Sequence, residues 1–168
     1  NTIYQLYADK KNGRLQNAKY FLMMPEYLSF KLTGVCKNEY TNATTTGLVN
    51  ANEKIWDTPL IHALGLTEEL FKPLYLPSST VGDLSAEVQK IVGFNSTVIF
   101  APSHDTASAV CACPMADNDL YISSGTWSLI GTEITQPILS DNARHLNFTN
   151  EAGNDYRFLF LKNYMGMW

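Results

Sequence analysis

The sequence predicts an α/β fold, and three patterns indicate it. The apolar, β-branched run at 97–101 predicts a buried strand, and the small residues of 105–113 predict a helix directly after it. Residues 120–123 and 127–134 predict two more strands, joined by a tight turn of glycine and hydroxyl side chains. Helical patterns fill much of the preceding chain, so helices and strands both contribute to the predicted fold.

The N-terminal part of the chain predicts mainly helices. One helix is expected within 1–24. A second begins at Met24-Pro25-Glu26, where proline takes a first-turn position that needs no N–H donor, and it ends at Gly34. Residues 39–50 are ambiguous, because their threonines favour a strand whereas a Thr or Asn there could cap a short helix. Residues 55–64 predict an amphipathic helix.

The remaining segments are shorter. Residues 81–85 predict a turn and 86–92 a short helix, whereas 136–155 are expected to be irregular and polar. Residues 156–160 predict a strand, and 161–168 predict the first turns of a helix. Because the chain ends on apolar residues and does not begin with methionine, we expect a piece of a longer protein.

The composition argues against several classes of function. The formal net charge of −4 argues against broad nucleic-acid binding, which needs a basic face, and no apolar run approaches the roughly 20 residues of a membrane span. The N-terminus lacks the features of a signal peptide, and three cysteines without a framework spacing fit a reducing compartment. We therefore expect a cytoplasmic protein. The three histidines are scattered, so no metal site is predicted.

Asp105 is the first candidate for chemistry. It follows a predicted strand and would lie in the first turn of the next helix, at the edge where open α/β folds bind ligands. The helix dipole there favours the ionised carboxylate by roughly 0.3–1 kcal/mol. Such a carboxylate can accept the proton of a sugar hydroxyl during phosphoryl transfer. The alternative is that Asp105 or Ser103 serves only as the helix N-cap.

The row Ser103-His104-Asp105 has the composition of a hydrolase triad. Side chains of consecutive residues normally diverge, so we reject a triad here. We interpret His104 instead as a hydrogen-bonding group that faces the same pocket as Asp105. A histidine with a purely structural role is the alternative.

The predicted turn Ser123-Ser124-Gly125-Thr126 is the second candidate. Backbone N–H groups in such a turn can bind an anion, and Thr126 can add a hydroxyl donor. Gly125 allows a positive φ and the close approach of a phosphate. The alternative is an ordinary hairpin turn, and Trp127, directly after it, is expected in the core. Together the carboxylate and the turn predict phosphoryl transfer to a hydroxyl.

Five short motifs lie in order along nearly the whole chain: FKLTG at 30–34, EYTNATTT at 39–46, SHDTASAV at 103–110, SSGTWSL at 123–129 and LKNYMGMW at 161–168. In these motifs the chain resembles the FGGY carbohydrate kinases, and most closely their rhamnulokinase branch. The resemblance implies an actin-like ATPase fold with two ribonuclease-H-like domains. It further implies that residues 1–114 are the later part of the N-terminal domain and 115–168 the beginning of the C-terminal, nucleotide-side domain.

The resemblance also implies an activity, namely ATP-dependent phosphorylation of the 1-hydroxyl of L-rhamnulose in rhamnose catabolism, with Mg²⁺ bridging the phosphates. Asp105 matches the catalytic base, and His104 and Thr106 match its sugar-contacting neighbours. Thr126, beside Gly125, matches a contact to the nucleotide phosphate. The implied partners are thus a small-molecule sugar and ATP.

Two alternatives stay open at this point. The chain could belong to a kinase for another ketose, such as L-fuculose or xylulose, or to a non-catalytic actin-like domain that binds nucleotide. The family's N-terminal phosphate hairpin and its downstream adenosine segment do not occur in these 168 residues. Because phosphoryl transfer requires both substrates to be positioned, we expect the chain alone to be inactive.

Overall fold

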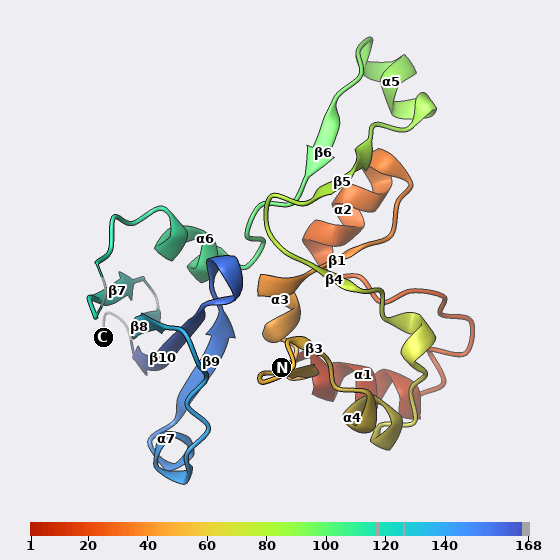
Figure 1. Cartoon of the computed structure of the whole chain (residues 1–168). Coiled ribbons are helices and arrows are strands. Elements are labelled where there is room, and N and C mark those ends of the chain that lie inside the picture. The colour runs from red at the N-terminus through yellow and green to blue at the C-terminus, as the bar shows by residue number, and fades with distance from the viewer. Residues whose placement is uncertain (117, 126, 166–168) are drawn as a thin grey trace.

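The computed structural model describes residues 1–116, 118–125 and 127–165 (Figure 1). Its helices are α1 (Thr2–Lys11), α2 (Met24–Thr33), α3 (Tyr40–Thr44), α4 (Thr58–Ala63), α5 (Ala86–Val92), α6 (Asp105–Cys111) and α7 (Asp141–His145), with 3-10 turns η1 (Glu68–Leu70) and η2 (Asn154–Tyr156). Its strands are β1 (Asn38–Glu39), β2 (Val49–Asn50), β3 (Ile55–Trp56), β4 (Leu74–Tyr75), β5 (Thr80–Asp83), β6 (Thr97–Ile99), β7 (Leu120–Ser124), β8 (Trp127–Ile134), β9 (Phe148–Ala152) and β10 (Phe158–Met165). The predicted α/β class is confirmed.

The largest sheet has four antiparallel strands in the order β7-β8-β10-β9. In one row across this sheet, Leu159 of β10 pairs with Glu133 on one side and with Glu151 on the other. The other strands form two-stranded pairs: β1 is parallel to β4, whereas β2 with β3 and β5 with β6 are antiparallel. The helices before α6 lie with these short pairs, and α3 contacts the large sheet at β9, where the N–H of Ala152 donates to the Thr44 hydroxyl (Figure 1).

Helix α6 packs on the large sheet through a small apolar cluster. Ala107 and Val110 of the helix are buried with Tyr121 of β7 and with two leucines of β10, Leu159 and Leu161. Gly131 of β8 makes the close packing possible, because a Cβ there would lie 2.7 Å from the Cβ of Leu161 and 2.7 Å from the hydroxyl of Tyr121. The packing holds the N-terminal end of α6 close to the sheet.

A second core lies among the N-terminal elements. Its buried members are Leu6, Leu48, Ile61, Leu66 and Phe71. They come from α1, α4 and the segments between the short strands. Leu6 and Phe71, which are 65 residues apart in sequence, pack in this same core. Each core thus holds one part of the chain, and α6 with its preceding turn lies where the two parts meet.

Several predicted elements of the N-terminal part are confirmed. Helix α2 begins at Met24 and is followed by Gly34, whose left-handed φ of 76° a glycine accepts without strain. Helix α5 and the β7–β8 hairpin also match their predicted ranges. The ambiguous segment after residue 38 contains helix α3, which is capped by the carboxylate of Glu39 rather than by a Thr or Asn.

Other predictions of local structure are wrong. Residues 80–83 form strand β5, not a turn, and 136–155 contain both α7 and β9. Residues 161–165 continue β10 instead of starting a helix. The predicted helix at 55–64 starts only at Thr58, because the Asp57 side chain accepts the N–H of Leu60 as its cap. The secondary structure of most of these segments depends on pairing with strands that are distant in sequence, and local periodicity does not reveal such pairing.

Strand β6 also differs from its prediction. It was expected to be a buried strand of an open α/β sheet, but it pairs only with β5 among the described residues, and its Ile99 is 61% exposed. Residues 100–104 separate it from α6. The position of Asp105 therefore depends on contacts of this connecting segment and not on the edge of a parallel sheet.

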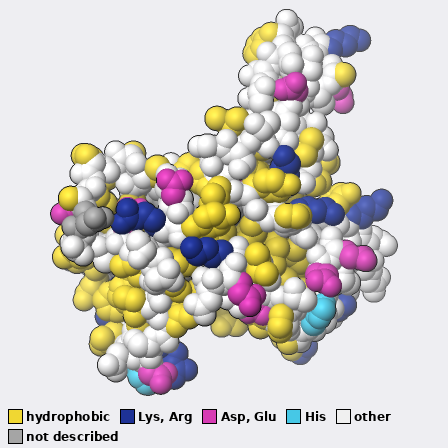
Figure 2. All heavy atoms as spheres, viewed as in Figure 1, with side chains coloured by type: hydrophobic (Ala, Val, Ile, Leu, Met, Phe, Trp, Pro, Cys, Tyr) yellow, Lys and Arg dark blue, Asp and Glu magenta, His cyan; other side chains and the backbone are white. Residues whose placement is uncertain are grey.

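Exposed apolar side chains are common on this molecule. Figure 2 shows hydrophobic side chains over much of the visible face, with lysines and arginines among them. On β7, Leu120 and Ile122 are exposed while Tyr121 between them is buried against α6, as the alternation of a strand requires. None of the helices in the described ranges has the length and apolar character needed to cross a membrane.

Candidate active site

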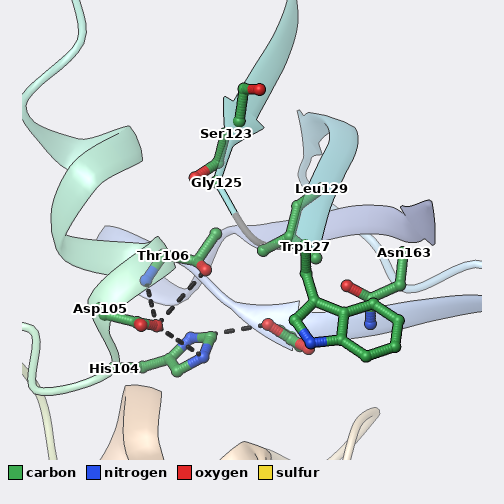
Figure 3. A pocket seen from close by; sticks show the side chains of 10 residues that line it. His104, Asp105, Thr106, Ser123, Gly125, Trp127, Leu129 and Asn163 are labelled. Carbon is green, nitrogen blue, oxygen red and sulfur yellow. Dashed lines mark hydrogen bonds and ion pairs between the residues drawn. The ribbon is translucent and has the colours of Figure 1, made fainter. Parts of the chain in front are cut away.

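A pocket of about 580 Å³ lies between the start of α6 and the large sheet (Figure 3). Its lining residues are His104, Asp105, Thr106, Ser123, Ser124, Gly125, Trp127, Leu129, Glu151 and Asn163. The structure thus brings together the two segments that the sequence singled out, the turn before α6 and the β7–β8 hairpin. Thr126, the predicted phosphate contact, lies outside the described residues.

Asp105 is the first residue of α6, and its side chain is 94% exposed. The Oδ1 atom accepts the backbone N–H of Thr106 at 2.7 Å and lies 3.3 Å from Nε2 of His104. No hydrogen bond from a described residue reaches the other oxygen, Oδ2. One oxygen is therefore held by the protein, and the other can accept a proton from a ligand hydroxyl.

The turn before Asp105 is fixed to the start of helix α3. Ser103 donates both its backbone N–H, at 3.2 Å, and its hydroxyl, at 2.6 Å, to Oε2 of Glu39. Glu39 is fully buried and also accepts the N–H and hydroxyl of Thr41 and the N–H of Asn42. The backbone N–H of His104 points to the Thr41 hydroxyl at 3.4 Å. These bonds restrict where α6 can begin.

These contacts test two interpretations of Ser103-His104-Asp105, as a helix N-cap and as a hydrolase triad. The N-cap of α6 is His104, without a side-chain capping bond, so neither Ser103 nor Asp105 is the cap. The side chains of His104 and Asp105 approach each other, so the expectation that they diverge is wrong. The rejection of a triad is still supported, because the Ser103 hydroxyl donates to Glu39 and not to His104.

The His104 ring lies between two carboxylates. Its Nε2 faces Asp105, and its Nδ1 lies 3.5 Å from Oε2 of Glu151 on β9. The side chains of His104 and Glu151 are each 19% exposed. Burial raises the pKa of Glu151, the nearby His104 lowers it, and the carboxylate of Asp105 raises it again. As predicted, His104 lines the same pocket as Asp105.

The β7–β8 turn lines the pocket differently from the prediction. Gly125 does not take a positive φ, and its N–H donates to the carbonyl of Trp127 at 3.0 Å. Trp127 was expected in the core, but it is 65% exposed and lines the pocket. Ser124 offers a hydroxyl that has only a 3.5 Å contact with Ser128. The described part of the chain contains no group of three His, Cys, Asp or Glu side chains that could hold a metal ion.

Sequence reasoning missed three residues of this region. Glu39 was treated as part of an ambiguous segment, Glu151 as part of an irregular one, and Asn163 as part of a helix. Asn163 lines the pocket from β10, where its amide can both donate and accept a hydrogen bond. The continuous apolar run at 158–161 is typical of a buried strand, and a strand extended beyond it could have placed Asn163 on the same sheet as the turn.

Comparisons with known proteins bear on the family of this chain. The model of the FGGY family of carbohydrate kinases, N-terminal domain, matches residues 6–112. Rhamnulokinases from Halalkalibacterium halodurans and Oceanobacillus iheyensis are each 52% identical to the chain over 170 residues, covering all of it. The chain spans 36% of the length of each of these relatives.

A solved structure supports the fold. The ligand-bound xylulose kinase from Lactobacillus acidophilus matches 95% of this chain and 33% of its own chain, with a TM-score of 0.81 at 23% sequence identity. A likeness at this identity concerns the fold, which is the actin-like ATPase fold that these sugar kinases share. With more than half of its residues matched by the family model, the chain belongs to the FGGY family of carbohydrate kinases.

Proposed function

We propose that this chain contributes the catalytic base of a kinase that transfers the γ-phosphate of ATP to the 1-hydroxyl of L-rhamnulose. One observation carries the proposal: Asp105 has one oxygen held by Thr106 and the other open to a pocket whose far side is the β7–β8 turn. The identity of 52% to two rhamnulokinases supports L-rhamnulose as the sugar. His104 and Thr106 are then the neighbours that contact the sugar.

The chemistry follows from this geometry. Oδ2 of Asp105 accepts the proton of the sugar 1-hydroxyl. At the same time the hydroxyl oxygen forms a bond to the γ-phosphorus, and the bond between the γ-phosphorus and the oxygen that bridges it to the β-phosphate breaks. The products are the sugar 1-phosphate and ADP. Because the transition state of phosphoryl transfer is loose, Asp105 acts mainly by orienting the hydroxyl toward the phosphorus.

The nucleotide belongs on the side of the β7–β8 turn. Gly125 and Thr126 are the proposed phosphate contacts, and Mg²⁺ enters on the phosphates of the ATP substrate. The N–H of Gly125 already donates to the carbonyl of Trp127 within the turn. Gly125 therefore contributes to phosphate binding by lacking a side chain at the pocket wall. We place the boundary between the two domains at 114/115, which the end of the family match at residue 112 supports. A reaction on ATP and a free sugar fits the cytoplasm.

The test is ADP release by the full-length protein with ATP, Mg²⁺ and a panel of L-rhamnulose, L-fuculose and D-xylulose. We expect the highest kcat/KM with L-rhamnulose. Asp105→Asn keeps the shape of the side chain but removes the base, so kcat should fall about 10²–10⁴-fold. Asp141→Asn is the matched control, because Asp141 also lies in the first turn of a helix and is 84% exposed, outside the pocket.

Each outcome has a distinct meaning. Near-normal kcat in Asp105→Asn would show that this carboxylate is not the base. Preference for L-fuculose or D-xylulose would keep the mechanism and change the sugar. Nucleotide binding without ADP release on any sugar would favour a non-catalytic domain.

A further inference from the structure

Glu151 is a half-buried carboxylate that the proposed reaction does not use. It lies on β9, one residue before Ala152, whose backbone N–H donates to the Thr44 hydroxyl of α3 at 3.0 Å. Its row partner in the sheet is Leu159, which is fully buried. The backbone of Glu151 is therefore held both by the sheet and by the N-terminal part of the chain. Its side chain has a fixed starting point from which it reaches His104.

The contact between Glu151 and His104 joins two atoms that lack other partners. Oε2 of Glu151 and Nδ1 of His104 are both buried, and neither has a hydrogen bond from a described residue. They face each other at 3.5 Å, and the opposite ring nitrogen, Nε2, lies 3.3 Å from Oδ1 of Asp105. Figure 3 marks both contacts of the His104 ring. The imidazole therefore connects the half-buried carboxylate to the exposed one.

This arrangement controls which ring nitrogen carries a proton. If Glu151 is protonated, its O–H donates to Nδ1 of His104 and the ring proton lies on Nε2, toward Asp105. If Glu151 is ionised, it accepts the N–H of Nδ1, and the doubly protonated ring then also carries an N–H on Nε2. Both states direct an N–H at Oδ1 of Asp105. Without Glu151, the neutral ring can instead turn an unprotonated nitrogen toward Asp105, which repels the carboxylate.

We propose that Glu151 is a positioning residue: it holds Nδ1 of His104, so that Nε2–H supports Oδ1 of Asp105 and Oδ2 stays directed at the sugar hydroxyl. This inference rests on the proposed function, because it assigns Glu151 a part in orienting the proposed base. Glu151 itself touches neither the reacting hydroxyl nor the phosphate in this scheme. It acts through His104.

The test is the steady-state kinetics of Glu151→Gln and Glu151→Leu in the full-length protein. We expect kcat to fall about 10- to 100-fold in the leucine variant, a smaller loss than removal of the base itself. The glutamine variant keeps an NH₂ group that can donate to Nδ1 and so leave the ring proton on Nε2, and it should therefore recover most of the activity. KM for ATP should stay within about twofold, because Glu151 does not face the nucleotide in this scheme.

Glu133→Leu is the matched control for the leucine variant. Glu133 occupies the same cross-strand row as Glu151, on the other side of Leu159, and its side chain is 20% exposed against 19% for Glu151. It does not line the pocket, so kcat should not change. A fall equal to that of Glu151→Leu would point to a general effect on the sheet and would overturn the proposal.

A double-mutant cycle with His104→Asn separates positioning from mere stability. If Glu151 acts through His104, its substitution has little further effect on kcat once the imidazole is gone. Independent, multiplicative losses would overturn the proposal. If the leucine variant does not fold, the cycle is run with Glu151→Ala, and a kcat of that variant equal to wild type also overturns the proposal. Failure of the proposed function looks different, because Asp105→Asn would then retain activity.

Discussion

Glu39, which is fully buried, and Glu151, which is half-buried, are two carboxylates that reach the same turn from different parts of the chain, and they are bonded in different ways. Glu39 accepts five hydrogen bonds, from Thr41, Asn42 and Ser103, within the N-terminal part. Glu151, on the large sheet, faces His104 at 3.5 Å without a hydrogen bond to its Oε2 from any described residue. One carboxylate is saturated with donors, and the other is not.

The difference indicates two kinds of task. A carboxylate with five donors is held at one position by these bonds, so it can fix the backbone around it. A half-buried carboxylate with one neighbouring imidazole can exchange a proton with that ring, and its pKa is raised by burial. We therefore expect substitutions at Glu39 to affect mainly folding, and those at Glu151 to affect mainly turnover.

Glu39→Gln should have the largest effect on stability. The amide retains one acceptor oxygen but turns an NH₂ group toward backbone and hydroxyl donors, which leaves several buried donors without a partner. We expect the free energy of unfolding to fall by about 3–5 kcal/mol, as when a buried charge network is broken. Urea unfolding of the full-length protein, followed by circular dichroism, measures this loss.

Glu53→Gln provides the control for this experiment. Glu53 is exposed in the turn after β2, so the same substitution there should change the free energy of unfolding by less than about 0.5 kcal/mol. If Glu39→Gln proved as stable as this control, the five bonds would not be what holds the turn, and the contrast with Glu151 would lose its basis.

Much of the local structure around the site could be predicted from the sequence. Asp105 at the start of a helix and the hairpin around Gly125 follow from short-range signals: small helix-forming residues after a polar tip, and a glycine between two apolar strands. Gly34 as the end of α2 follows from the same kind of signal. These elements depend on neighbours within a few residues.

The partners of the site could not be predicted in this way. Glu39 lies 64 residues before Ser103, and Glu151 lies 47 residues after His104, a separation that no periodicity encodes. Asn163 lines the pocket only because β10 pairs with β8, and the sequence alone favoured a helix there. Residues that support a site from distant strands need the tertiary structure, or motifs already known from a family, to be found.

Glu26 extends the comparison to a buried carboxylate with three donors. It accepts the N–H groups of Met23 and Glu39 and the side-chain amide of Asn38, and it is 1% exposed. Burial raises its pKa from 4.5 to about 7, although these three bonds act in the opposite direction. The three donors thus offset only part of the effect of burial on the pKa of Glu26. In its number of hydrogen-bond donors, Glu26 lies between Glu39 and Glu151.

The sign of the resulting pH dependence is clear. Between pH 4.5 and 7 the folded state holds the Glu26 proton more tightly than the unfolded state does, so the contribution of Glu26 to stability falls as the pH rises through this window. The unfolding free energy of the native protein, compared with Glu26→Gln, should therefore fall by about 2 kcal/mol from pH 5 to 7.5. A constant difference between the two proteins over this range would place the pKa of Glu26 outside it.

Ser103→Ala should have the smallest effect on the free energy of unfolding, and it tests the contribution of a single hydrogen bond. It removes one hydroxyl donor, at 2.6 Å, from Oε2 of Glu39 and leaves the other four bonds in place. We expect a loss of about 1 kcal/mol in unfolding free energy, the net value of one hydrogen bond, measured against Ser108→Ala on the exposed side of α6. A loss close to that of Glu39→Gln would mean that the five bonds form as one cooperative unit. In that case the five hydrogen bonds to Glu39 form or break together, and the position of Asp105 depends on Ser103 as much as on Glu39.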